Sequence, residues 1–178
     1  RRLELYPWDV AANQEAVKEI LEADCLIVGP GSLYTSLLPN LLVKGLADAV
    51  IKSTALKIFV CNLMTQPGES DGLSAAEHLD VLVRHVGHRL FDWVIVNRAE
   101  LPVSVLRQYA AKGAQPVDPA EQTLTAMGYH VIADNLISYG TYLRHDAHRL
   151  GDLIEQVMNQ RRMAHHKGRD ALGRRREV

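Results

Sequence analysis

The chain has 178 residues, 47% of them hydrophobic, and a formal net charge of −1; these values suit one folded domain and exclude a wholly disordered protein. No apolar run reaches the ~18 residues that a membrane-spanning helix requires. The first residue is not Met, so we expect that the chain could be a fragment of a longer protein. The first residues show no signal peptide, although a truncated start would hide one.

Two elements are expected before the first buried strand. Residues 2–7 alternate apolar and polar side chains, which predicts an edge or entering strand. Residues 11–23 place four apolar side chains on one helical face, which predicts an amphipathic helix.

Four short apolar runs then predict strands at residues 25–29, 57–62, 93–97 and 130–134. They are rich in Val and Ile and lack strict alternation, which is typical of strands covered on both faces. Helical patterns at residues 39–53, 74–87, 102–113, 119–128 and 144–160 separate or follow them. The helix at 74–87 begins on Ser74 with Glu77 three residues later, a capping-box pattern. This alternation predicts an α/β fold, a three-layer α/β/α sandwich with a mainly parallel sheet over residues 1–160.

The two cysteines and the C-terminal tail bound the chemistry further. Cys25 and Cys61 border apolar strands, so we expect buried thiols in a reducing cytosol, and no Cys/His spacing indicates zinc. Residues 161–178 hold seven Arg or Lys against two acidic residues and lack apolar periodicity, so we expect a basic, disordered tail. A solvated terminus is favoured over a nucleic-acid contact.

The loop after the first strand reads Gly29-Pro30-Gly31-Ser32, followed by Tyr34, Thr35 and Ser36. In open α/β sheets, ligands bind at the carboxyl ends of the strands. Glycines admit a ligand close to the backbone, and a following helix start offers N–H groups to an anion. This loop therefore suits a phosphate, although an ordinary strand-to-helix turn explains it equally well.

The loop after the second strand contains Asn62, Thr65, Gln66, Glu69 and Asp71. Because it is acidic, it suits a sugar, a nucleoside or Mg²⁺ held by Glu69 and Asp71 rather than a bare phosphate. A simple Pro-Gly turn is the alternative.

Two residues outside these loops also stand out. A cation at a helix start is disfavoured by the helix dipole, so Arg144 at the start of the last predicted helix indicates a phosphate or carboxylate partner. A surface ion pair with Asp146 is the alternative. Tyr109 is either a core residue or the wall of a base or sugar pocket. No nucleophile–base pair is evident, since His78 falls within a helix.

Three longer segments of the chain are "ADCLIVGPGSLYTSLLPNLLVKGLADAV", "VCNLMTQPGESDGLSAAEHLDVL" and "YLRHDAHRLGDLI". They closely resemble the gluconeogenesis-factor family of bacteria, whose superfamily includes 2-phospho-L-lactate transferase. The resemblance implies a Rossmann-like fold and a cytoplasmic, UDP-sugar-binding regulator of carbon metabolism, cell shape and cell-wall precursor supply. A homodimer is also implied. A Mg²⁺-dependent transferase is the alternative, and a protein that recruits a partner through its basic tail is a third hypothesis.

Carried onto this chain, the family motifs give a set of ligand-binding candidates in two loops and two later positions. They are Gly29, Gly31, Ser32, Tyr34, Thr35, Ser36, Asn40, Asn62, Thr65, Gln66, Glu69, Asp71, Tyr109 and Arg144. The chain departs from the pattern at Leu73 and Ser74, where the family has an aromatic residue and Thr. The Gly-rich loop that opens the family domain has no counterpart here, so we expect an incomplete domain.

Overall fold

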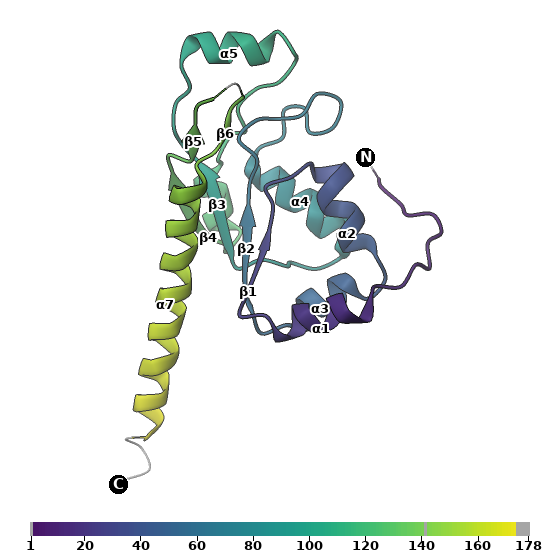
Figure 1. The fold of residues 1–178 in the computed structure, drawn as a ribbon, viewed down its shortest axis with the longest axis vertical. Coiled ribbons are helices and arrows are strands. Elements are labelled where there is room, and N and C mark those ends of the chain that lie inside the picture. The colour runs from purple at the N-terminus through teal and green to yellow at the C-terminus, as the bar shows by residue number, and fades with distance from the viewer. Residues whose placement is uncertain (1, 141, 174–178) are drawn as a thin grey trace. The chain divides into compact units, whose positions relative to one another are not determined.

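A four-stranded parallel sheet forms the centre of the fold in a computed structural model of the chain (Figure 1). The structure describes residues 2–140 and 142–173, with side chains as far as residue 163. The described chain divides into two compact units, residues 1–144 and 145–178. The first unit contains the whole parallel sheet and both predicted ligand loops. It also contains every predicted helix except the last one, at residues 144–160.

The sheet has the order β1-β2-β3-β4, from Cys25–Val28, Leu56–Val60, Trp93–Asn97 and His130–Asp134, so sequential strands are neighbours. All three pairs are parallel. The predicted α/β class with a parallel sheet is therefore confirmed. Because every strand points the same way, the loops after β1 and β2 leave at the same end of the sheet.

Short helices connect the strands. The first unit contains α1 (Gln14–Glu22), the π-helical turn η1 (Leu33–Leu37), α2 (Leu38–Leu42), α3 (Leu46–Lys52), α4 (Ala75–Val86), α5 (Val103–Ala110) and α6 (Glu121–Ala126). Their buried side chains join those of the strands in one core that includes Leu33, Leu38, Phe59, Leu79 and Val94. Each such side chain contributes roughly 1.5–3 kcal/mol when it is fully buried.

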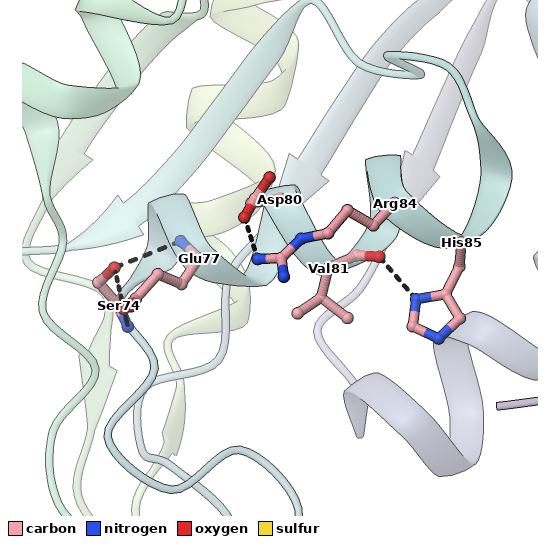
Figure 2. Close-up of polar contacts among 6 residues, drawn as sticks. All are labelled: Ser74, Glu77, Asp80, Val81, Arg84 and His85. Carbon is pink, nitrogen blue, oxygen red and sulfur yellow. Dashed lines mark hydrogen bonds and ion pairs between the residues drawn. The ribbon is translucent and has the colours of Figure 1, made fainter. Parts of the chain in front are cut away.

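The helix α4 begins as its sequence predicts. The Ser74 hydroxyl accepts from the Glu77 N–H, and the Glu77 carboxylate accepts from the Ser74 N–H, which completes the capping box (Figure 2). These bonds from Ser74 lower the pKa of Glu77. Farther along, Arg84 pairs with Asp80 one turn earlier. Gly87 ends the helix in a left-handed conformation.

Two predicted elements are wrong. Residues 2–7 form no strand, and the pairing nearest to them is an isolated bridge between Ala11 and Lys44. The single helix predicted at 39–53 is interrupted, because Val43 is extended and Gly45 adopts a φ of 90° before α3 begins. A glycine adopts that conformation without a Cβ clash, so the chain turns there and starts a new helix.

The first strand is less covered than its sequence suggests. No residue of β1 is fully buried, and the Ile27 side chain is 47% exposed, whereas four of the five β2 residues are buried. The prediction of coverage on both faces is therefore wrong for this strand, and β4, at the other edge of the sheet, likewise has no fully buried residue. Cys25 is accordingly only partly buried, while Cys61 is buried as expected.

The C-terminal part differs from the prediction at both of its ends. Two short strands that the sequence did not indicate, β5 (Ile137–Ser138) and β6 (Arg144–His145), pair with each other. Helix α7 begins only at Ala147 and continues to Gly173. The predicted boundary at residue 160 stays a prediction, and residues 174–178 of the tail lie outside the described residues. No helix in the described ranges is long and apolar enough to span a membrane.

Candidate functional site

The first loop leaves β1 through a glycine that no other residue can replace without strain. Gly29 has a φ of 92°, and its peptide bond to Pro30 is cis. A Cβ built on Gly29 would lie 2.4 Å from the carbonyl oxygen of Val60 on β2. The ends of β1 and β2 therefore approach closely because the side chain is absent.

The two predicted ligand loops are fastened to each other. The Asn62 side chain pairs with the backbone of Gly31: its Oδ1 accepts from Gly31 N–H at 2.9 Å, and its Nδ2 donates to the Gly31 carbonyl at 3.0 Å. Gln66 Nε2 donates to the Ser32 hydroxyl at 2.7 Å. The sequence prediction placed these four residues at one ligand, and the structure brings them together by direct bonds between them.

The start of η1 already holds an anion from the protein itself. One carboxylate oxygen of Glu69 accepts from the N–H groups of Tyr34 and Thr35, at 2.8 and 2.9 Å, and from the Thr35 hydroxyl at 3.2 Å. The sequence indicated these N–H groups as phosphate donors and Glu69 as a repulsive neighbour. In this conformation the carboxylate takes the place expected for a phosphate, so an external anion reaches these donors only when Glu69 moves.

The second loop is shaped by its own polar side chains. Both carboxylate oxygens of Asp71 accept from Gly68 N–H, at 3.0 and 2.9 Å. Thr65 is only 2% exposed, and it exchanges hydrogen bonds with the Gln115 backbone at 2.7 and 3.0 Å. These bonds attach the second loop to the segment that follows α5.

The other predicted residues of the first loop lie on its surface. Ser36 and Asn40 are exposed, and Asn40 Nδ2 donates to the Ser36 carbonyl at 2.7 Å across one turn. Both remain accessible to a ligand, and their role in binding stays a prediction.

Tyr109 and Arg144 belong to neighbouring segments. The Tyr109 hydroxyl on α5 accepts from the N–H of Leu143, the residue before Arg144, at 3.0 Å. Arg144 lies on β6 and not at a helix start, so the argument from the helix dipole is wrong for it. Its side chain is exposed, and no ion pair involves it within the described part of the chain. The ion pair considered as the alternative does not form there.

Asn97 ends the third apolar run, so the rule that located Asn62 also identifies it, although the family motifs did not place it among the ligand-binding candidates. It is the last residue of β3, and its Oδ1 accepts from the N–H of Leu136 at 3.0 Å. It also exchanges bonds with Ala99 at 3.2 and 3.4 Å.

His78 is more unusual than its helical position suggested. It is 1% exposed, its Nδ1 lies 2.8 Å from the Ser74 carbonyl, and its Nε2 has no partner among the described residues. A carbonyl only accepts, so Nδ1 carries the hydrogen and Nε2 holds a lone pair. Burial lowers the pKa of His78, while its bond to Ser74 and the nearby charges of Glu77 and Glu69 act in the opposite direction.

The predicted magnesium ligands bond to backbone N–H groups in this conformation. One oxygen of Glu69 and both oxygens of Asp71 accept such bonds, and their role as metal ligands stays a prediction. Within residues 2–140 and 142–163, no three His, Cys, Asp or Glu side chains form a group suited to a metal.

A cavity of about 730 Å³ lies beside α4, and its lining residue His85 makes an edge-on ring contact with Tyr34 of the first loop. Its lining includes Arg2, Trp8, Leu42, Arg84 and His85. His85 Nδ1 lies 2.8 Å from the Val81 carbonyl (Figure 2). Its Nε2 accepts from Leu3 N–H at 3.1 Å. Since both ring nitrogens are occupied and each arginine has an acidic partner, the cavity offers little unused polarity to a ligand.

Comparison with known proteins places the chain in a family. The model of the family described as 2-phospho-L-lactate transferase CofD matches residues 1–137. The chain belongs to this family. It is 40% identical over 161 residues to the gluconeogenesis factor of Bacillus subtilis (strain 168), a match that covers 90% of this chain and 51% of that protein. It is 39% identical over 155 residues to the gluconeogenesis factor of Halalkalibacterium halodurans, with coverages of 86% and 48%.

A solved structure agrees with this placement of the CofD family member. The crystal structure of a UPF0052 family protein from Bacillus halodurans superposes with a TM-score of 0.84 at 40% identity, over 86% of this chain and 50% of that one. The resemblance predicted from the sequence is confirmed. The chain spans about half the length of the curated relatives it matches.

Proposed function

We propose that this chain carries the nucleotide-sugar site of a cytoplasmic regulator of the gluconeogenesis-factor type, which links carbon metabolism to cell shape and cell-wall precursor supply. The observation that carries the proposal is the joining of the two loops, in which Asn62 holds Gly31 and Gln66 holds Ser32. Polar groups from two strand ends thereby form one rim, where ligands of open α/β sheets bind.

The charges of this rim favour different binding places for the phosphates and for the sugar of the ligand. Glu69 occupies the N–H groups of Tyr34 and Thr35, so a phosphate at that point meets a carboxylate. Arg144 is exposed and in no described ion pair, and a guanidinium matches a phosphate with two parallel hydrogen bonds. We assign the phosphates of a UDP-sugar to Arg144 and its hydroxyl-rich parts to the two loops.

Titration calorimetry with UDP-N-acetylglucosamine tests the proposal. We expect saturable binding, and Arg144→Ala should weaken it by about 1.5–3 kcal/mol, the range for a hydrogen bond to a charged group. Arg107→Ala, which removes another exposed arginine from α5, is the matched control and should leave affinity unchanged. Equal affinities of the wild-type protein and Arg144→Ala would remove Arg144 from the site, and no binding by the wild type would refute the proposal.

The description of the matching family favours one alternative, a transferase that acts on a nucleotide-activated substrate with Mg²⁺. Glu69 and Asp71 would have to leave their present backbone partners to hold the metal. Turnover that is abolished by EDTA and by Asp71→Asn would support this alternative, and turnover that survives both would exclude it. The homodimer implied by the resemblance stays a prediction that sedimentation tests.

A further inference from the structure

The segment that carries Arg144 is held by two side chains from other elements. Asn97, at the end of β3, accepts from the N–H of Leu136 at 3.0 Å, just before β5. Tyr109, near the end of α5, accepts from the N–H of Leu143 at 3.0 Å, just before Arg144. The two bonds hold the chain just before β5 and just before β6.

The Tyr109 bond acts at the point where it most affects Arg144. Consecutive Cα atoms are ~3.8 Å apart, so a bond at the Leu143 N–H restricts the position of the Arg144 Cα. The Arg144 side chain is long and exposed, and ordering it costs up to ~2 kcal/mol of rotamer entropy. Movement of the Arg144 backbone adds to this entropy cost. A restricted backbone lowers the cost, because the guanidinium then has fewer accessible positions.

The same bond limits what the Tyr109 hydroxyl can do for a ligand. Its oxygen is engaged by a backbone N–H, and Tyr109 is partly buried. The helix end that carries it is in turn fastened, because the Tyr109 carbonyl accepts from Ala114 N–H at 3.1 Å and the next residue, Gln115, bonds to Thr65 of the second loop. In Figure 1, α5 and β5 lie near the same end of the sheet as that loop.

We propose that Tyr109 is a positioning residue, whose hydroxyl holds the Leu143 peptide so that Arg144 is placed to bind the phosphates of a nucleotide. This differs from the expectation that the Tyr109 ring forms a wall of the ligand pocket. The identity of the ligand rests on the proposed function. The positioning role rests on a separate observation, the bond between the Tyr109 hydroxyl and the Leu143 N–H. Because Asn97 still holds the chain just before β5, loss of the hydroxyl loosens the segment without releasing it.

A double-mutant cycle tests the positioning role, with UDP-N-acetylglucosamine as the probe. Tyr109→Phe removes the hydroxyl and keeps the ring, and we expect affinity to fall about three- to tenfold, the range covered by one neutral hydrogen bond. In the Arg144→Ala background the same change should have no further effect, because Tyr109 acts only through Arg144. An equal loss in both backgrounds would mean direct contact with the ligand and would overturn the inference. Tyr142→Phe, an exposed tyrosine of the same segment, is the control and should change nothing.

Amide hydrogen exchange without ligand separates this inference from the proposed function. The Leu143 amide should be protected in the wild-type protein and in Tyr142→Phe, and should exchange several-fold faster in Tyr109→Phe. If the wild type binds no UDP-sugar, the proposed function fails, and exchange at Leu143 alone decides whether Tyr109 fixes the segment. Unchanged protection in Tyr109→Phe would overturn the inference whatever the binding result.

Discussion

Gly29→Ala is the substitution whose cost the structure defines most sharply. The new Cβ would lie 2.4 Å from the Val60 carbonyl oxygen, where an ordinary carbon–oxygen contact needs about 3.3 Å. The Cβ is attached directly to the backbone that follows β1, and the oxygen belongs to the backbone of β2, so relief requires the two chains to move about 1 Å apart. A left-handed φ adds roughly 1–2 kcal/mol for any residue other than glycine.

The expected loss is about 2–5 kcal/mol, a large share of the ~5–15 kcal/mol that stabilises a typical domain. It is the sum of the backbone strain and about two weakened hydrogen bonds between β1 and β2. Gly45→Ala is the matched control, because Gly45 has a φ of 90° and no atom within 4 Å of its added Cβ. It should lose only the strain, about 1–2 kcal/mol.

Urea unfolding followed by circular dichroism measures both variants against the wild-type protein. The difference between the two losses isolates the contact with Val60, since the φ values of 92° and 90° are nearly equal. Equal losses would refute the steric argument and would show that β1 tolerates a side chain there. A Gly29→Ala protein that fails to fold while Gly45→Ala folds would agree with the prediction.

Two further predictions concern buried titratable groups. Burial lowers the pKa of His78, so below about pH 6.5 the unfolded chain binds a proton that the folded chain does not. The contribution of His78 to the free energy of unfolding should therefore be complete above that pH. Below it, the free energy of unfolding should fall by at most ~1.4 kcal/mol per pH unit. His78→Asn should flatten this slope between pH 7.5 and 5.5 in urea unfolding while the exposed control His88→Asn keeps it, and a wild-type slope in His78→Asn would contradict the assignment. Burial also raises the pKa of the Cys61 thiol to about 12, so iodoacetamide should label Cys25 in the native protein and Cys61 only after unfolding. Mass spectrometry that finds equal labelling rates for the two cysteines would show that Cys61 is not sealed from solvent.

Local rules recovered most of the elements, because the physical signals that specify them are local. The strands at 93–97 and 130–134 match β3 and β4 at both ends. The capping box at Ser74 depends on residues only three positions apart, so it is read directly from the sequence. The break at Gly45 was missed because apolar residues continue through it, and a glycine within a helical pattern does not by itself reveal its φ.

The candidate site divides in the same way. Its location at the strand ends followed from the polar residues after each apolar run, and this rule identifies both Asn62 and Asn97. The role of each side chain did not follow, because it depends on contacts between residues far apart in the chain. Glu69 is 35 positions from Tyr34 and accepts a hydrogen bond from its N–H. Tyr109 is 34 positions from Leu143, to which its hydroxyl is bonded.

The sequence by itself determined the α/β class, the parallel order of alternating elements, the family and the two loops that form the rim. These follow from periodicity, from caps and from motifs that are contiguous in the chain. Only the tertiary structure decided that Glu69 accepts from the N–H groups that the sequence predicted for a phosphate, that β1 is a partly exposed edge, and that Arg144 lies on a strand next to a residue bonded to Tyr109. Hydrogen-bond partners are selected by distance in space, and sequence spacing does not encode that distance.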